Sequence, residues 1–214
     1  MIAEIVGVSG TGKSTIAQAI AQHDSAIQAN YRVKWRYVLP AYYVRTALAI
    51  PTYLVHYRSK GKVLWAALKW MTYLEKLHYA LSRLDKNNLI LLDQGPVFWF
   101  TYLHAFGSDG IQDKWFTRWW TRELESWSSI LDFIFYLDCT DAVLIERVRN
   151  RSKKHRIQGL SDQEAREFLS RYREGYRHVL ARLTHKDGPS VCHLSTERES
   201  PGQIADQILN ELLA

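Results

Sequence analysis

The sequence predicts an α/β protein in which a parallel sheet has helices on both faces. Short apolar runs at residues 2–8, 88–93, 133–138 and 190–195 alternate with longer segments of helical periodicity. This alternation is typical of parallel α/β folds. A glycine-rich segment also joins the first apolar run to the first helical segment, as a strand–turn–helix unit requires. A chain of 214 residues suits one domain with a buried core, which we expect over residues 1–214.

The elements are expected in the following order. The first strand ends at the glycines, and apolar residues at helical spacing follow over 13–22. Alternating side chains over 32–37 are compatible with a further strand, and residues 41–84 have a helical pattern without strands. A capping box of Ser161 and Glu164 precedes a long apolar stripe, and Ser200 and Pro201 begin the last helix.

The charge of the chain is concentrated in one segment. Of the 28 Lys and Arg residues, ten lie in 31–84, together with a single acid, Glu75. Such a segment indicates an anionic partner without identifying it. Residues 37–57 are apolar enough to consider a membrane span, but Arg45 lies in their middle, so a buried or surface helix is preferred. Cys139 and Cys192 are expected to be reduced thiols in a cytoplasmic protein.

The glycine-rich segment matches a complete phosphate-binding loop. Residues 7–14 read G-V-S-G-T-G-K-S, which fits G-x-x-x-x-G-K-[ST] between a strand and a helix. Glycines let successive backbone amides face the phosphates, and the following helix offers its positive end. The Lys side chain reaches the β- and γ-phosphates, and the Ser hydroxyl binds Mg²⁺. The expected ATP-binding residues of this loop are Gly7, Gly10, Thr11, Gly12, Lys13, Ser14 and Thr15.

Acidic and basic groups later in the chain suit the same chemistry. Asp93 ends the second apolar run, where it would hold Mg²⁺ with Ser14 or take a proton from an attacking hydroxyl; capping of the next helix is the plainer alternative. Arg147, Arg151 and His155 recur every four residues and share one helix face. We interpret residues 147–160 as a lid that closes over the transferred phosphate, with a solvated basic helix end as the alternative.

These motifs resemble the nucleoside and nucleotide kinase group of P-loop proteins, and thymidylate kinases most closely. The similarity covers the phosphate loop, residues 89–95 (LILLDQG), residues 135–138 (FYLD), the lid, residues 171–176 (RYREGY) and residues 195–201. It implies a three-layer P-loop fold with a five-stranded parallel sheet in the order 2-3-1-4-5, a short lid, and γ-phosphate transfer from Mg·ATP. It further implies that Arg147 lies against the adenine and Arg151 on the phosphates, as catalytic residues beside Lys13 and Asp93.

Two departures from these kinases concern the acceptor. Gln94 follows Asp93 where the group usually has an arginine, and the phosphate loop has Ser9 in a stretch that usually contains an acidic residue. Both disfavour thymidylate as the substrate. The acceptor side is expected in the helical residues 31–84 and 97–127. Candidate acceptor-binding residues are Tyr42, Arg45, Gln94, Arg118 and Arg122.

The sequence thus predicts an ATP-dependent kinase with Mg²⁺ as its metal and a small anionic acceptor. A nucleotide, a sugar phosphate and a lipid-linked saccharide all remain open as that acceptor. The alternative is a P-loop NTPase with a regulatory role and no small acceptor. Residues 31–84 would then contact nucleic acid or an anionic membrane, which is also compatible with a kinase. A homodimer is left open as well.

Overall fold

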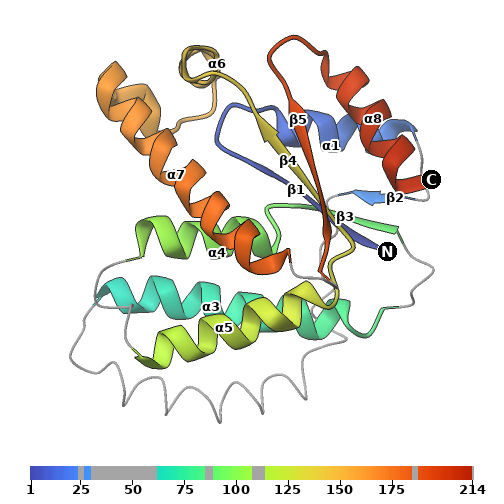
Figure 1. Cartoon of the computed structure of the whole chain (residues 1–214). Helices are drawn as coiled ribbons and strands as arrows, with labels where there is room; N and C mark the ends of the chain where they lie inside the picture. The colour runs from blue at the N-terminus through green and yellow to red at the C-terminus, as the bar shows by residue number, and fades with distance from the viewer. Residues whose placement is uncertain (24–26, 30–61, 85–88, 108–113, 185–187, 214) are drawn as a thin grey trace.

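The computed structural model describes residues 1–23, 27–29, 62–84, 89–107, 114–184 and 188–213 (Figure 1). Its strands are β1 (Ile2–Gly7), β2 (Ile27–Ala29), β3 (Leu89–Asp93), β4 (Phe133–Asp138) and β5 (Ser190–Ser195). Its helices are α1 (Lys13–His23), α3 (Lys62–Leu81), α4 (Pro96–Phe106), α5 (Lys114–Ser128), α6 (Asp141–Asn150), the 3₁₀ helix η2 (Arg156–Gly159), α7 (Asp162–Leu183) and α8 (Pro201–Leu213).

The strands form one parallel sheet in the order β2-β3-β1-β4-β5. In the central strand, Ile5 lies opposite Asp93 of β3 and Phe135 of β4. Because parallel strands end at the same edge, the phosphate loop after β1 and the acidic end of β3 are neighbours. The expected α/β fold with a parallel sheet is confirmed.

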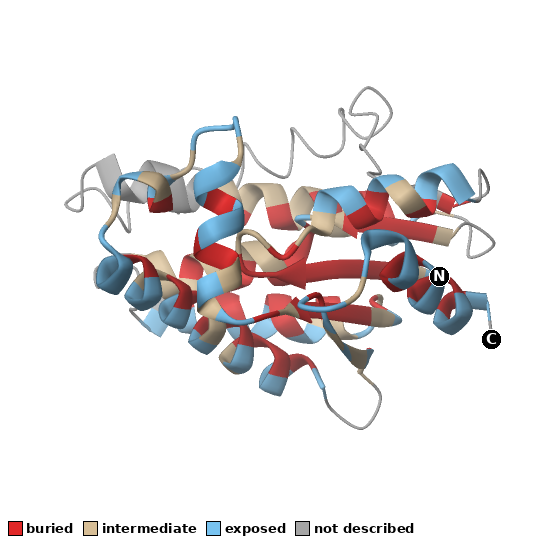
Figure 2. Ribbon diagram, turned by 90° about the horizontal axis from the view of Figure 1, so that it is seen from above, coloured by how far each residue is buried: buried red, intermediate tan, exposed pale blue. Residues whose placement is uncertain are grey.

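Helices cover both faces of the sheet, and each face has its own buried core. On one face α1 and α8 pack against Ile5, Leu91 and Phe135. On the other face α3, α4, α5, α6 and α7 pack against Val6, Leu92 and further strand residues. Figure 1 shows the two helical layers on opposite sides of the strands, and Figure 2 shows the buried sheet between helices with exposed outer faces.

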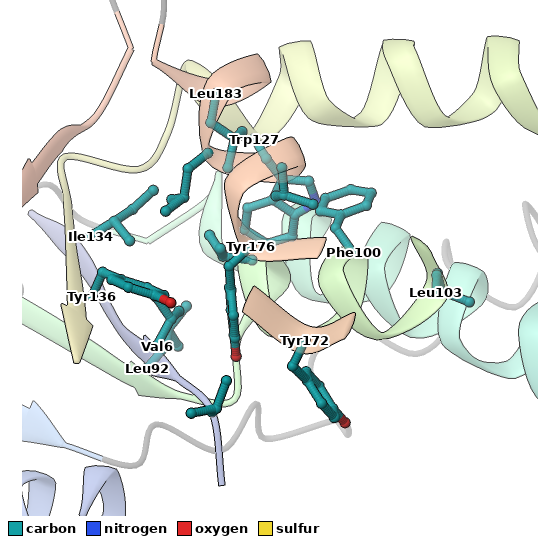
Figure 3. Close-up of a cluster of buried hydrophobic side chains, with 14 of the residues drawn as sticks. Val6, Leu92, Phe100, Leu103, Trp127, Ile134, Tyr136, Tyr172, Tyr176 and Leu183 are labelled. Atoms are coloured by element: carbon teal, nitrogen blue, oxygen red, sulfur yellow. The ribbon is translucent and has the colours of Figure 1, made fainter. Parts of the chain in front are cut away.

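Large aromatic side chains fill the second core. Trp127 and Tyr176 are fully buried. Figure 3 shows Tyr176 inside this cluster, with Tyr136 of β4 on one side and Phe100 of α4 on the other. The Tyr176 hydroxyl donates a hydrogen bond of 3.1 Å to the carbonyl oxygen of Gly7, so the core reaches the start of the phosphate loop.

Most expected elements appear close to their predicted bounds. The Ser161–Glu164 capping box is present at the start of α7, and α8 begins at Pro201. The strand β2 was not predicted, because its three residues are too few to give a periodic signal. The alternative strand over 32–37 and the apolar residues 37–57 lie outside the described residues. Within the described residues, no helix has the length and apolar character needed to cross a membrane.

A buried carboxyl group joins the central strand to α4. Glu4 of β1 is fully buried and accepts hydrogen bonds from the backbone amides of Val97, at 2.8 Å, and Phe98, at 3.0 Å. These are amides of the first turn of α4, which have no partner within the helix itself. Burial raises the pKa of Glu4 to about 8, against the opposing effect of these hydrogen bonds, and the negative charge of Asp93 raises it further. Glu4 is therefore mainly protonated at neutral pH.

Replacing Glu4 with Gln should change how stability depends on pH. A pKa raised from 4.5 to about 8 stabilises the fold most below pH 4.5, and that contribution is lost as pH rises toward 8. Between pH 5 and 8 wild type should lose on the order of 3 kcal/mol relative to Glu4→Gln, measured by urea unfolding at several pH values. Glu125→Gln, on the exposed surface of α5, is the control and should follow the wild-type profile. Parallel profiles for wild type and Glu4→Gln would contradict this interpretation.

Candidate active site

The phosphate loop has the backbone conformation that its glycines permit. Gly7, Gly10 and Gly12 all have positive φ angles, of 147°, 99° and 84°. A Cβ on Gly7 would lie 2.2 Å from the carbonyl oxygen of Leu137 in β4, which is closer than atoms can approach. The loop is thus fitted tightly against the neighbouring strand.

Lys13 begins α1 and folds back across the loop. Its ammonium group donates hydrogen bonds to the carbonyl oxygens of Gly7, at 2.7 Å, and Val8, at 2.9 Å. Removal from water lowers the pKa of Lys13 to about 8; Asp93 opposes this shift and Arg151 adds to it. Both charged groups therefore lie within electrostatic reach of Lys13. A bound polyphosphate would favour the charged form of the ammonium.

The other loop residues frame this centre. The Thr11 hydroxyl is buried and donates 2.9 Å to the carbonyl oxygen of Val8, which holds the loop closed. Ser14 and Thr15 are exposed in the first turn of α1. The loop therefore presents Ser14 on the open side and keeps Thr11 as an internal brace.

Ser14 and Asp93 meet as expected for a magnesium site. The Ser14 hydroxyl donates 2.8 Å to Oδ2 of Asp93, although the two residues lie 79 positions apart. The other carboxylate oxygen, Oδ1, is buried and has no hydrogen-bond partner among the described residues. Mg²⁺ prefers carboxylate and hydroxyl oxygens, so this pair fits that ion. Helix capping does not describe Asp93, because the cap residue of α4 is Gly95 and makes no side-chain cap bond.

Glu4 fixes the turn that follows Asp93. Gln94 is exposed and has a φ angle of 63°, a left-handed conformation that is uncommon for side chains other than glycine. A Cβ on Gly95 would lie 2.8 Å from the carboxyl carbon of Glu4, so only glycine fits there. A role for Glu4 was not predicted from the sequence. Its signal was a charged residue in the middle of an apolar strand, where burial of a carboxyl group calls for a specific partner.

The segment predicted to be a lid lies against the phosphate loop. His155, on the segment after α6, has its Nε2 3.0 Å from the hydroxyl oxygen of Ser9. Arg151 caps the end of α6, and its Nε is buried without a hydrogen-bond partner among the described residues. The predicted lid residues and the phosphate loop therefore do come together.

Arg147 lies in the last turn of α6, one turn before Arg151, and contacts the loop after β5. Its guanidinium donates to the carbonyl oxygen of Thr196 at 2.9 Å and to the Thr196 hydroxyl at 3.3 Å. This brings Arg147, which the resemblance places against the adenine, together with the 195–201 segment.

Asp138 is held by an arginine that the sequence analysis did not single out. Arg173 of α7 donates from Nε to both carboxylate oxygens of Asp138, at 3.1 and 3.0 Å, and also pairs with Asp141. Asp138 therefore helps join β4 to α7, and its carboxylate is occupied in a structural ion pair.

The acceptor candidates among the described residues, Gln94, Arg118 and Arg122, are not brought together. Tyr42 and Arg45 lie outside the described residues. Arg118 is exposed on α5. Nη2 of Arg122 lies 3.2 Å from Oε1 of Glu123 and 3.7 Å from Oε1 of Glu75. Figure 1 shows α5 beyond α4, on the side away from α1. The structure thus separates α5 from the phosphate loop, and of the three described candidates only Gln94 adjoins Asp93.

Replacing Gly7 with Ala should destabilise the protein through the phosphate loop. The new Cβ would meet the backbone of β4, so the free energy of unfolding should fall by about 3 kcal/mol, measured by urea denaturation. Gly202→Ala is a matched control in α8, where the nearest atom is 4.0 Å away. This second change should raise stability slightly, because alanine favours helix. Equal effects of the two substitutions would exclude a steric role for Gly7.

Known proteins share the fold and the phosphate loop of this chain. The profile of the AAA domain family matches residues 4–168. A sequence comparison with curated proteins gives no match. Among solved structures, deoxyadenosine kinase from M. mycoides is 16% identical with a TM-score of 0.58, covering 100% of this chain and 99% of that one. Thymidylate kinase from Candida albicans is 16% identical, with a TM-score of 0.55 and coverage of 99% and 90%.

Shikimate kinase from Bacteroides thetaiotaomicron is also similar, at 17% identity, a TM-score of 0.54 and coverage of 100% and 98%. Likeness at such low identity establishes the shared fold. The family profile covers most of the 214 residues, including the phosphate loop, Asp93 and the lid. The chain belongs to the AAA domain family of P-loop proteins, and its structural neighbours include thymidylate, deoxynucleoside and shikimate kinases.

Proposed function

We propose that this protein is an ATP-dependent kinase that transfers the γ-phosphoryl group to a small acceptor. The observation that carries the proposal is the arrangement around Lys13. Asp93 and Arg151 both act on the charge of Lys13, and each has a buried polar atom without a partner among the described residues. Buried polar groups normally have partners, so two unsatisfied atoms at one phosphate loop favour a ligand there. A triphosphate with Mg²⁺ satisfies both.

The chain's own residues have distinct roles in this mechanism. The phosphate loop holds the triphosphate, and the Lys13 ammonium leaves the carbonyl oxygens of Gly7 and Val8 to contact phosphate oxygens. Ser14 and Asp93 would hold Mg²⁺, which supplies neutralisation of phosphate charge. Asp93 orients the acceptor hydroxyl or takes its proton. Arg151 stabilises the charge that develops on the transferred group, and Arg147 lies beside the adenine.

The acceptor class has coarser support. The similar structures include kinases for a deoxynucleoside, for thymidylate and for shikimate, so a small-molecule acceptor is what they share. The ten cations of residues 31–84 favour an anionic acceptor, which includes nucleotides, sugar phosphates and lipid-linked saccharides. Gln94 is the candidate acceptor contact that adjoins Asp93 in the sequence and the turn.

A regulatory NTPase is the second candidate. The same cations would bind nucleic acid or an anionic membrane surface, and such a protein would hydrolyse ATP slowly without a small acceptor. The two candidates differ in whether a small molecule accelerates ADP formation.

The test of the proposed function is ADP formation from Mg·ATP with nucleosides, nucleoside monophosphates, sugars and sugar phosphates. One class should stimulate turnover, and Lys13→Ala should lower the stimulated rate at least about 100-fold because charge stabilisation is lost. Lys114→Ala, an exposed lysine at the start of α5, should keep the wild-type rate. Slow turnover that no compound accelerates would favour the regulatory NTPase, and full activity of folded Lys13→Ala would refute the mechanism.

The affinity for Mg·ATP should fall at alkaline pH. Lys13 has a pKa of about 8 in the free protein, so it is mainly charged at pH 7 and mainly neutral at pH 9. ATP binds the charged form and raises its pKa, so affinity should drop about tenfold between these pH values in calorimetric titrations. In Lys13→Arg the guanidinium stays charged, and affinity should be nearly constant over the same range. An equal drop in both proteins would assign the effect to another group.

A further inference from the structure

A hydrogen bond joins the lid to the phosphate loop at Ser9, which is not one of the fixed residues of the loop motif. The Ser9 hydroxyl occupies one of the variable positions of the loop, and His155 Nε2 lies 3.0 Å from it. The two residues are 146 positions apart, so the contact exists only in the folded chain. Neither residue has a role in the mechanism above.

The hydrogen bonds of the His155 imidazole fix its orientation and indicate which ring nitrogen carries the proton. Its Nδ1 accepts a hydrogen bond of 3.2 Å from the amide of Ile157, so Nδ1 carries no hydrogen. Burial lowers the pKa of His155, and the positive charges of Arg151 and Lys13 lower it further. The ring is thus neutral at pH 7 with its proton on Nε2, which donates to Ser9.

Gln158 connects the backbone of His155 to the backbone of Arg151. Its Oε1 accepts from the His155 backbone amide at 2.9 Å, and its Nε2 donates to the carbonyl oxygens of Arg151, at 2.9 Å, and Val148, at 3.1 Å. Ser9 is therefore linked to the backbone of Arg151 through the side chain and backbone of His155 and the side chain of Gln158. This connection joins the phosphate loop to the backbone that carries the unpartnered Arg151 guanidinium nitrogen.

We propose that Ser9 and His155 form a latch that positions Arg151 on the triphosphate, with His155 as a positioning residue of the lid. The inference rests on the proposed function only in taking ATP as the nucleotide. When the latch is closed, Arg151 is held over the phosphate loop in advance of binding, so less ordering is required when the triphosphate arrives.

The lid keeps its fold without the latch, because other contacts anchor it. Ile157 is fully buried in η2, and Arg149 donates to Asp162 at 2.7 Å and to the carbonyl oxygen of Leu160 at 2.9 Å. Loss of the imidazole should therefore alter the position of Arg151 without unfolding the lid. A positioning role of His155 therefore predicts weaker nucleotide binding with the lid still folded, whereas a structural role predicts an unfolded lid.

The experiment is a double-mutant cycle on nucleotide affinity, with Ser9→Ala, His155→Ala and the double variant titrated with Mg·ATP and with AMP. Each single variant should weaken Mg·ATP binding about tenfold, the double variant no more than either one, and AMP binding should not change. His155→Gln keeps a donor close to the place of Nε2 and should recover most of the affinity. His23→Ala, an exposed histidine at the end of α1, is the matched control with wild-type affinity.

The outcomes separate the latch from its alternatives. Additive losses in the double variant, or equal losses for Mg·ATP and AMP, would overturn the latch. A fall in melting temperature that accounts for the loss of affinity, without recovery in His155→Gln, would also overturn it and leave a structural role. These are binding measurements, so the latch can stand even where no acceptor stimulates turnover and the proposed kinase activity fails.

Discussion

The buried carboxyl group of Glu4 holds the centre of this site in place. It lies in the central strand and accepts the amides of Val97 and Phe98, which begin α4. The turn between Asp93 and α4 is thereby tied to β1 as well as to β3, and Gly95 provides the close approach that this requires. The position of Asp93 relative to the phosphate loop depends on this link. A small change in the turn would move the carboxylate away from Ser14.

Positively charged side chains are gathered beside the phosphate loop. Burial lowers the pKa of both Lys13 and His155, and the positive charge of Arg151 lowers both further. Holding positive groups together away from water costs free energy, and a bound polyphosphate would offset that cost. The hydrogen bond between Ser9 and His155 joins residues 151–160 to the phosphate loop without adding a charge, because the imidazole is neutral.

Local motifs made part of the site predictable. The phosphate loop was identifiable because its glycine spacing encodes a backbone shape, and Asp93 because it ends an apolar run. The expectation that Arg147, Arg151 and His155 share one helix face was wrong, because α6 ends at Asn150 and the segment from 151 is irregular before η2. That residues 147–160 act as a lid stays a prediction. Gln94 stands where the kinase group usually has an arginine, and helical spacing made Arg122 a candidate to replace it. In the structure Arg122 lies beside Glu75 and Glu123. Spacing along a helix does not reveal which layer the helix occupies.

The sequence by itself determined the fold class, the phosphate loop and the acidic strand end, because each is written in residues that are adjacent or periodic. Tertiary structure alone decided the contacts between distant segments. Glu4 with α4, Ser9 with His155, and Arg173 with Asp138 join residues that are 93, 146 and 35 positions apart. Such pairs leave no periodic trace in one sequence, because their distance is set by strand order and by how the helices pack on the sheet.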